Sequence, residues 1–300
     1  MDRMGGDTGG RWRFRGMGWD WEAAVPVLRW GRGAERRDGG LGYGRELGFR
    51  AVGARECQGA RGNACPLGAV VPGRSTGGLC PECARLDRAH SVAADTIADD
   101  PRPYRVYLAW FGPGLVKVGI TAEERGSARL LEQGAVVFGW LGRGPLMAAR
   151  RTEELLRAAL GVPDRIPYAQ KRAVRALLPS TVRERAAELD ALHARAVVLD
   201  ALPEALERVP FRPADQVAVF GLDGAPVASA AVRELVEGGT VAGRLVAAAG
   251  PDLHLAGADG RIIVVDTRVM AGWELVAADP RDAVTVPLEE LPRGVQDGLF

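Results

Sequence analysis

The chain has 300 residues, of which 47% are hydrophobic and 26% are charged, and its formal net charge is +1. These values are typical of a globular protein with roughly two or three compact units. No apolar run approaches the roughly 18 residues of a membrane-spanning helix. The Gly- and Arg-rich start also lacks an apolar segment of the signal-peptide type. We therefore expect a cytoplasmic protein without a membrane partner.

Charge is distributed unevenly along the chain. Residues 1–200 contain 31 Arg or Lys against 23 Asp or Glu, whereas residues 201–300 contain 8 against 15. This split predicts a basic face for a polyanion such as DNA or RNA, and an acidic C-terminal unit that packs against that face or shields it. The alternative is that Arg is simply the preferred cation, because only Lys117 and Lys171 are lysines.

The N-terminal third is expected to be rich in β-structure. We predict a disordered start over residues 1–10. Over residues 11–98, short apolar runs bounded by glycines favour strands and turns, and this β-rich region contains all four cysteines. A linker with two prolines follows at residues 99–103, because proline interrupts both helices and sheets.

The middle of the chain, residues 104–200, predicts the order β-β-α-β-α followed by further helices. A Gly-Pro-Gly turn at residues 112–114 joins the first two strands into a hairpin. Thr121 and Glu124 fit a capping box that opens the first helix. The expected elements are strands at 105–111 and 115–120, a helix from Thr121 towards Gln133, a strand at 135–141, and helices at 146–160, 167–178 and 181–199.

Residues 213–300 predict a C-terminal β-rich unit with two hairpins. One Asp-Gly pair, at residues 223–224, separates apolar runs at 217–220 and 226–229. A second pair, Asp259 and Gly260, separates runs at 253–255 and 262–265. Asp-Gly between apolar runs is a strong signal for a tight hairpin turn.

The four cysteines, Cys57, Cys65, Cys80 and Cys83, lie close together in the sequence. A Cys-Pro-Glu-Cys turn lets two thiolates face one ion, and the earlier pair can complete a tetrahedral zinc site. Disulfides are rare in a reducing cytosol. We therefore predict one structural zinc ion that supports a loop-rich segment.

More than one set of ligands is compatible with this cluster. The seven residues between Cys57 and Cys65 exceed the usual spacing of roughly two to four. One cysteine can therefore be a bystander that His90 replaces. The same cysteines can also form a thioredoxin-like redox pair, or remain thiols without a ligand.

The middle of the chain also resembles a known nuclease fold. Val-Tyr-Leu at 106–108, Lys-Val-Gly-Ile-Thr at 117–121 and Arg129 on the following helix resemble a divergent GIY-YIG endonuclease core. The expected elements have the order that this fold uses. The resemblance implies that Tyr107 belongs to the first motif, that Arg129 holds the scissile phosphate, and that Glu153 on the next long helix binds the metal ion.

The chain is more closely similar to an uncharacterised family, domain of unknown function 2797. This similarity rests on residues 117–121, Arg129 and residues 133–135, and it extends over the cysteine segment and residues 243–273. The similarity implies a relationship to this family but does not imply any particular activity.

Two positions depart from the classical GIY-YIG pattern. Lys117 stands where classical members carry Tyr, although divergent branches also have Lys here. Gln133 stands one helical turn after Arg129, where some members have His. Without that His, general-base catalysis would fall to Tyr107 or to a metal-bound water.

These residue types also suit phosphodiester hydrolysis on chemical grounds. The reaction needs a carboxylate that holds a divalent cation, a cationic donor for the developing charge, and a base or a positioned water. Glu153 can supply the carboxylate, Arg129 the cationic donor, and Tyr107 the base. At about 100° per residue, Glu153 lies at the edge of the buried helical stripe, whereas Glu154 points to solvent.

Each of these residues also has a purely structural alternative. Tyr107 can be a half-buried strand residue. Arg129 can pair with Glu132, and Glu153 can pair with the nearby arginine at 157. A basic surface around the same helices either follows a phosphate backbone or is simply solvated. Its members are Arg143, Arg150, Arg151, Arg157, Arg165, Lys171, Arg172 and Arg175.

Together these patterns predict an α+β fold with a GIY-YIG-like β-β-α-β-α core. An N-terminal β-rich zinc-ribbon region and a C-terminal β-hairpin unit flank this core. The expected function is a metal-dependent phosphodiesterase that acts on DNA or RNA with Mg²⁺ or Mn²⁺, in which Tyr107 and Lys117 assist the nucleophile. The alternatives are a catalytically inactive, zinc-stabilised protein that binds nucleic acid or a partner, and a scaffold in which zinc serves only stability.

Overall fold

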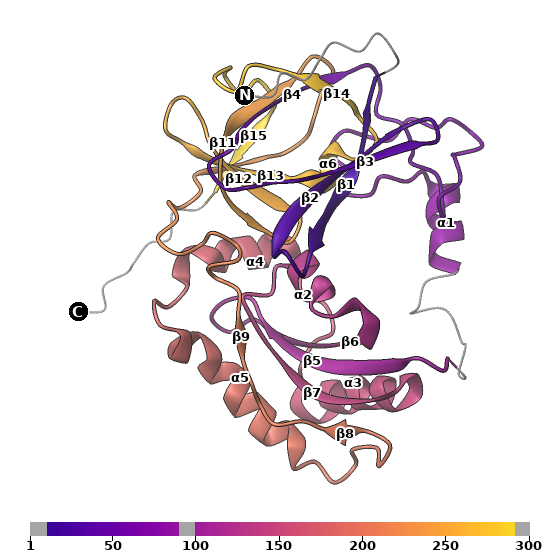
Figure 1. Cartoon of the computed structure of the whole chain (residues 1–300), viewed down its shortest axis with the longest axis vertical. Helices are drawn as coiled ribbons and strands as arrows, with labels where there is room; N and C mark the ends of the chain where they lie inside the picture. The colour runs from indigo at the N-terminus through magenta and orange to yellow at the C-terminus, as the bar shows by residue number, and fades with distance from the viewer. Residues whose placement is uncertain (1–10, 90–99, 292–300) are drawn as a thin grey trace.

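The computed structural model describes residues 11–89 and 100–291, so the expected disordered start at residues 1–10 lies outside the described residues. The described chain is a mixed α+β protein, as predicted, with more strand than helix. It contains one sheet of ten strands and one of five, which occupy the upper and lower halves of Figure 1. Within these ranges no helix is both long and apolar enough to span a bilayer.

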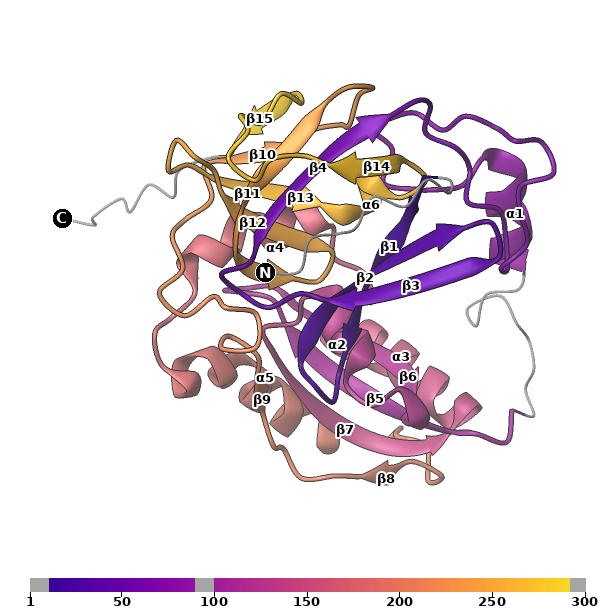
Figure 2. The same ribbon diagram turned by 45° about the horizontal axis from the view of Figure 1, so that its top comes forward.

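The ten-stranded sheet is built from both ends of the chain. Its strands are β1 (Arg13–Asp20), β2 (Val25–Arg32), β3 (Glu35–Gly40), β4 (Glu46–Val52), β10 (Ala230–Val232), β11 (Thr240–Ala249), β12 (Asp252–Ala256), β13 (Ile262–Asp266), β14 (Glu274–Ala277) and β15 (Leu288–Glu290). Their order is β15-β10-β13-β12-β11-β4-β14-β1-β2-β3. Because β4 pairs with both β11 and β14, the two β-rich ends share one sheet, as Figure 2 also shows.

The N-terminal and C-terminal strands of the larger sheet share a single apolar core. Phe14 and Leu28 from the N-terminal strands belong to the same buried cluster as Leu245 and Leu253 from the C-terminal strands. The buried indole of Trp19 donates a 3.0 Å hydrogen bond to the carbonyl of Gly250. Burial of apolar surface is the main favourable term in folding, so each end of the chain stabilises the other.

The five-stranded sheet carries the helices of the middle segment. Its elements are β5 (Pro103–Trp110), β6 (Val116–Ala122), η1 (Glu123–Arg125), α2 (Ala128–Gln133), β7 (Val137–Pro145), α3 (Leu146–Leu160), α4 (Tyr168–Val174), η2 (Arg175–Leu177), α5 (Val182–Val197), β8 (Glu207–Arg208) and β9 (Ala214–Asp215). β5 is central and antiparallel to β6 and β7. Val106 and Leu108 pack in a cluster with α3 and α5, whereas Tyr107 and Ala109 face the opposite cluster, which includes α2.

The predicted element order of the middle segment is observed, but the start of its first helix was predicted wrongly. Thr121 lies within β6, and α2 begins only at Ala128 without a side-chain cap. Gly126 adopts a φ of +50°, and the ring of Trp21 packs so closely that a Cβ on this glycine would lie 3.2 Å from it. Glu124 pairs with Arg102 at 3.0 Å instead of capping the helix.

One of the two C-terminal hairpins is formed and the other prediction was wrong. β12 and β13 pair across Asp259 and Gly260, as expected. Residues 217–229 contain no strand. The carboxylate of Asp215 accepts the Val217 N–H at 3.0 Å, and the Phe220 N–H bonds four residues back at 2.8 Å. This coiled turn buries Phe220 completely, so the apolar run reaches the core without a strand.

The cysteine segment is not a ribbon of strands. Between residues 53 and 80 the β-pairing is limited to one isolated bridge between Glu56 and Val70. The helix α1 (Pro81–Ala89) follows this segment. The β-rich part of the N-terminal region is therefore β1 to β4. Cys57, Cys65 and Cys80 lie on the loop segment that follows, and Cys83 lies in the first turn of α1, which Figure 1 shows beside the larger sheet. Loops of this kind cannot be held together by ladder hydrogen bonds, so another constraint is required.

Candidate functional site

The four cysteines meet at one point. The Sγ atoms of Cys57, Cys65, Cys80 and Cys83 all lie within 4.8 Å of one another, and the Cys65–Cys80 pair is 3.8 Å apart. Tetrahedral coordination with metal–sulfur bonds of about 2.3 Å requires sulfur–sulfur distances of about 3.8 Å. The cluster is therefore compatible with a structural metal ion bound by four thiolates. The alternative ligand His90 lies outside the described residues.

Local backbone geometry directs the sulfur atoms towards each other. Gly59 has a φ of +76°, and a Cβ there would lie 1.8 Å from the Asn63 carbonyl, so only glycine fits this turn. The backbone N–H of Cys80 donates to the Cys57 sulfur at 3.1 Å. Hydrogen bonds from backbone N–H groups lower the pKa of the Cys65 thiol to about 6, and the N–H of Ala69 has the largest effect. Such donors stabilise the thiolate, the form that binds metals.

Arg55 connects the cysteine segment to the C-terminal half of the larger sheet through hydrogen bonds. This side chain is 1% exposed, and burial lowers its pKa to about 10. It donates to the carbonyls of Pro72 and Ser75 at 2.6 and 2.7 Å, on the loop before Cys80. It also donates to the carbonyls of Arg268 and Ala271, in and after the helix α6 (Thr267–Met270), at 2.9 and 2.8 Å. One buried guanidinium thus satisfies carbonyls from two distant segments.

A separate cleft of about 870 Å³ lies at the β6 edge of the five-stranded sheet. Tyr107 from β5, Lys117 from β6, Arg129 from α2 and Glu153 from α3 all line it. These four residues are the ones that the sequence singled out. The cleft therefore brings together side chains from four elements that are separated along the chain.

Gln133 connects two of these residues. Its Oε1 accepts a 2.8 Å hydrogen bond from the Lys117 amine, and its Nε2 donates to the Tyr107 hydroxyl at 2.8 Å. Burial, aided by the charge of Arg129, lowers the pKa of Lys117 to about 8, and burial raises the pKa of Tyr107. Gly119 makes room for this hydroxyl, because a Cβ there would lie 2.3 Å from it.

Glu153 and its neighbour have different surroundings. Glu153 is partly buried in the cleft, whereas Glu154 is exposed and does not line it. Burial and then the charge of Asp164, which also lines the cleft, raise the pKa of Glu153. A carboxylate in this setting gains from a nearby cation.

Arg129 lies at the exposed end of the cleft. Glu132, its expected partner, pairs instead with Arg125 at 2.8 Å. Among the described residues no carboxylate lies within ion-pair distance of the Arg129 guanidinium. The side chain is therefore available to an anion in the cleft.

The cleft also contains residues that the sequence did not assign to the catalytic site. Tyr168 and Lys171, from α4, form one wall together with Ile166. The Lys171 amine lies 3.9 Å from the Phe111 ring and 4.3 Å from the Tyr168 ring. Burial and the charge of Lys117 lower its pKa to about 7. The sequence predicted Lys171 only as a member of the basic surface.

The expected basic surface is smaller than predicted, because three of its members turn inward. Lys171 is 3% exposed. Arg172 and Arg175 bond the buried carboxylate of Asp252 in β12, each with a contact of 2.6 Å. The acidic C-terminal unit thus packs against basic residues of the middle segment, which is one of the two outcomes that the charge asymmetry predicts.

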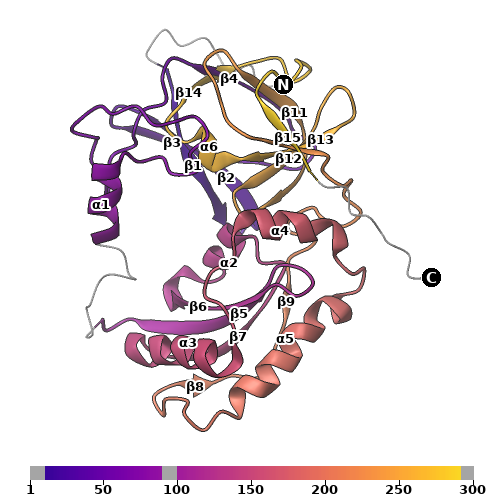
Figure 3. The same ribbon diagram turned by 180° about the vertical axis from the view of Figure 1, so that it is seen from behind.

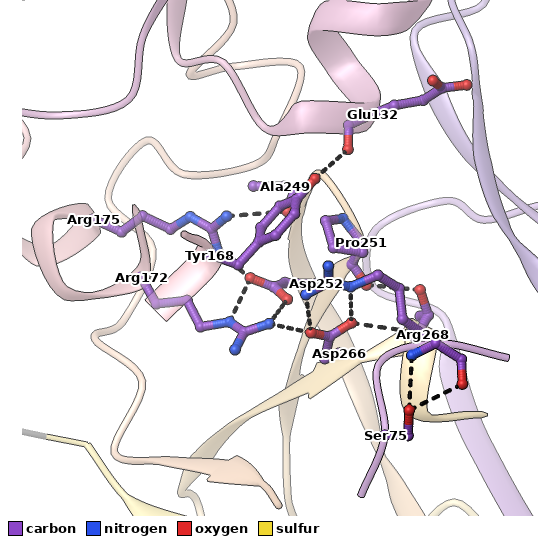
Figure 4. A network of polar contacts seen from close by, with 12 residues as sticks. Ser75, Glu132, Tyr168, Arg172, Arg175, Ala249, Pro251, Asp252, Asp266 and Arg268 are labelled. Carbon is purple, nitrogen blue, oxygen red and sulfur yellow. Dashed lines mark hydrogen bonds and ion pairs between the residues drawn. The ribbon is translucent and has the colours of Figure 1, made fainter. Parts of the chain in front are cut away.

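Figure 4 shows the network of polar contacts that holds α4, the helix that forms one wall of the cleft. Arg172 lies between Asp252 and Asp266. Arg268 bonds Asp266 at 2.6 Å and stacks 4.2 Å from the Tyr168 ring, whose hydroxyl donates to the Glu132 carbonyl at 3.0 Å. Figure 3 shows α4 at the junction of the two sheets. The larger sheet therefore holds one side of the cleft in place.

Comparison with known proteins gives a family but no activity. No curated protein and no solved structure was found to match the chain. A family model described as a protein of unknown function, DUF2797, matches residues 44–275. This range includes all four cysteines and every residue that lines the cleft. The chain is therefore a member of the DUF2797 family.

Proposed function

We propose that the cleft is the active site of a metal-dependent phosphodiesterase of the divergent GIY-YIG type, acting on DNA or RNA. The observation that carries this proposal is the convergence of Tyr107, Lys117, Arg129 and Glu153 on one cleft. They were selected from sequence motifs alone and come from four elements. Their residue types match the needs of phosphodiester hydrolysis.

Arg129 is assigned to the scissile phosphate. A guanidinium can bond two phosphate oxygens at once and keeps its charge at every physiological pH. Arg129 is exposed at the cleft and has no carboxylate partner among the described residues, so binding a phosphate breaks no existing ion pair. Arg165, which is also exposed at the cleft, adds positive charge for a neighbouring phosphate.

Glu153 is assigned to a Mg²⁺ or Mn²⁺ ion. Magnesium usually binds through one or two carboxylates together with water and substrate phosphate oxygens. The carboxylates that line the cleft are Glu153 and Asp164, and the raised pKa of Glu153 reflects burial and their mutual repulsion. These donors fit a hard divalent cation, which when bound would polarise the phosphoryl group.

Tyr107 and Lys117 are assigned to the nucleophile. Both are nearly buried and are bonded to opposite ends of the Gln133 amide, so their positions are defined before substrate arrives. With a pKa of about 8, a fraction of the Lys117 amine is neutral at physiological pH. A neutral amine can accept a proton from the attacking water.

The cysteine cluster is assigned one structural Zn²⁺. Four thiolates fill the tetrahedral coordination of zinc and leave no position for substrate. The sulfur–sulfur distances suit this geometry, and the surrounding loops have little ladder hydrogen bonding of their own. We therefore assign stability, and no catalytic role, to this metal.

A cleavage assay with variants of the phosphate-binding group tests the proposed function. Labelled single- and double-stranded DNA and RNA are incubated with the protein in Mg²⁺ or Mn²⁺. The wild type should cleave at least one substrate, and Arg129→Gln should lower the rate by about 100-fold or more. Arg183→Gln removes an exposed charge from α5 outside the cleft and should leave the rate nearly unchanged.

Two results would contradict the proposal. One is equal cleavage by the wild type and Arg129→Gln, which would point to a contaminating nuclease. The other is salt-sensitive binding of nucleic acid without cleavage in either metal, which would favour the inactive, zinc-stabilised binding protein.

A further inference from the structure

The two lysines of the chain meet at one glutamine. Among 39 Lys and Arg residues only Lys117 and Lys171 are lysines. The Lys117 amine donates to Oε1 of Gln133 at 2.8 Å, and the Lys171 amine donates to the Gln133 backbone carbonyl at 2.9 Å. Gln133 is 8% exposed, so its hydrogen bonds form away from bulk water. These contacts hold both the backbone and the side chain of this residue.

The partners of Gln133 determine the orientation of its amide. Nε2 lies 3.1 Å from the carbonyl oxygen of Arg129. A carbonyl oxygen only accepts, so the amide atom that faces it must carry hydrogen. At the other end, the Lys117 amine supplies an N–H to Oε1. Reversing the amide would set two oxygens against each other at Arg129, and both contacts therefore select the same orientation.

This orientation decides the role of the Tyr107 hydroxyl. The second N–H of Gln133 points to Tyr107 and donates to its oxygen at 2.8 Å. The oxygen accepts in this bond, so its own proton is left for a different acceptor. Tyr107 lines the cleft, and its hydroxyl lies over Gly119, where a Cβ would be 2.3 Å from the hydroxyl oxygen.

We propose that Gln133 is a positioning residue that holds the Tyr107 hydroxyl as a hydrogen-bond donor towards a substrate oxygen in the cleft. Lys171 acts one step further away, since it holds the Gln133 backbone. The inference rests on the proposed function for the identity of that oxygen, which is an oxygen of the phosphodiester or of the attacking water. The direction of the Gln133–Tyr107 bond does not depend on that function.

The pKa of Tyr107 reports this direction. A donor to the phenol oxygen stabilises the phenolate, so its removal by Gln133→Met should raise the pKa of Tyr107. If Tyr107 donated to Gln133 instead, the same substitution would lower the pKa. The charged groups Arg129 and Glu153 also act on Tyr107, and they are the same in both proteins.

The experiment uses the full chain with 3-fluorotyrosine, whose phenol ionises at a lower pH than tyrosine, and follows fluorine NMR signals against pH. The chain has four tyrosines, and Tyr107→Phe identifies the signal. A higher pKa in Gln133→Met than in the wild type supports the inference, whereas a lower or equal value overturns it. Gln170→Met, on the exposed surface of α4, should leave the pKa unchanged.

One further measurement keeps the inference testable if Gln133→Met is unstable, and a second one applies if that variant folds. In the folded wild type, the Gln133 amide protons should exchange slowly with water and show NOEs to the Tyr107 ring, and fast exchange would overturn the inference. If the wild type cleaves nucleic acid, Gln133→Met should lower kcat about tenfold or more with little change in KM. If no protein cleaves, only the proposed function fails, because the NMR measurements use no substrate.

Discussion

Arg172 of α4 bonds both carboxylate oxygens of Asp252 in β12, at 2.6 and 2.9 Å, and the Asp252 side chain is completely buried. Arg175 adds a contact of 2.6 Å to the same carboxylate. Burial alone would raise the pKa of Asp252, but the charges of Arg175 and Arg172 outweigh it and lower this pKa to about 2. The pair joins the wall of the cleft to the sheet formed by the two ends of the chain.

Removing the Asp252 carboxylate should destabilise the protein strongly. Asp252→Asn leaves the buried Arg175 guanidinium without its counter-charge and removes one of the two carboxylates that Arg172 contacts. We expect a loss of about 3–5 kcal/mol in the free energy of unfolding. Urea unfolding measures this loss. Asp279→Asn breaks an exposed pair with Arg281 and should have no measurable effect. Equal stability of both variants and the wild type would contradict a structural role for the Arg172–Asp252 pair.

Loss of a cysteine ligand should release the metal. We expect about one zinc per chain in the wild type and much less in Cys83→Ser, because three ligands bind a structural zinc more weakly than four. Metal analysis by mass spectrometry and the melting temperature give the two readouts. Asn63→Ala changes an exposed residue of the loop between Cys57 and Cys65 and should keep both values. Wild-type protein that is free of zinc and melts at the same temperature as Cys83→Ser would rule out the zinc assignment.

A methyl group at position 119 should displace the Tyr107 hydroxyl. The new Cβ of Gly119→Ala would lie 2.3 Å from that oxygen, and overpacking of this kind costs about 1–3 kcal/mol. We expect lower stability in denaturant and weaker cleavage. Gly39→Ala in β3 meets no atom within 4 Å and serves as the control. If the two alanine variants behave alike, the close approach of Tyr107 to Gly119 is not significant.

His254 should make the protein less stable at mildly acidic pH. Its ring is 5% exposed and its Nε2 has no hydrogen-bond partner among the described residues. Burial, followed by the charge of Arg175, lowers its pKa from 6.5 to about 4. Between these values the unfolded chain binds a proton that the folded chain does not. The free energy of unfolding should therefore fall by up to about 3 kcal/mol as pH drops from 6.5 to 4.

The variant His254→Leu tests this pH dependence, because it removes the titrating ring and keeps an apolar side chain of similar size. Urea unfolding at several pH values should give a flatter profile for the variant between pH 6.5 and 4. Parallel profiles for both proteins would show that other groups cause the loss of stability in acid.

Local sequence signals were sufficient for some elements. The helix α3 has the predicted bounds because its buried residues recur at helical spacing, and Pro145 and Gly161 stand directly outside its ends. β12 and β13 were predicted because a tight Asp-Gly turn joins them. The four cysteines were recognised as a cluster because they are close in sequence and no other cysteines occur.

Other features depend on residues that are distant in sequence. The pairing of β4 with β11 and β14 has no local signal, because these strands are about 190 to 230 residues apart. α2 begins only after Gly126, which has a φ of +50° and packs against the ring of Trp21 from another unit. Arg172 and Arg175 were assigned to a basic surface that either follows a phosphate backbone or is solvated, because their partner Asp252 lies about 80 residues away.

In the candidate cleft, too, some features have a local sequence signal and others depend on residues that are distant in sequence. Motif order pointed to Tyr107, Lys117, Arg129 and Glu153, but the hydrogen bonds through Gln133 appear only when β5, β6 and α2 are packed together. Lys171 enters the cleft because α4 is held against the larger sheet, and no spacing rule in the sequence predicts this.

The most direct test of the proposed nuclease site compares two neighbouring glutamates of α3. Glu153→Gln removes the carboxylate assigned to the metal ion, and Glu154→Gln removes the same charge from the exposed face of the same helix. The rate of nucleic-acid cleavage in Mg²⁺ or Mn²⁺ is measured for both variants and the wild type, with the fold checked by circular dichroism. We predict activity in the wild type and Glu154→Gln, and a loss of about 100-fold or more in Glu153→Gln. Full activity of a folded Glu153→Gln would contradict the metal-binding role of this carboxylate and with it the proposed site.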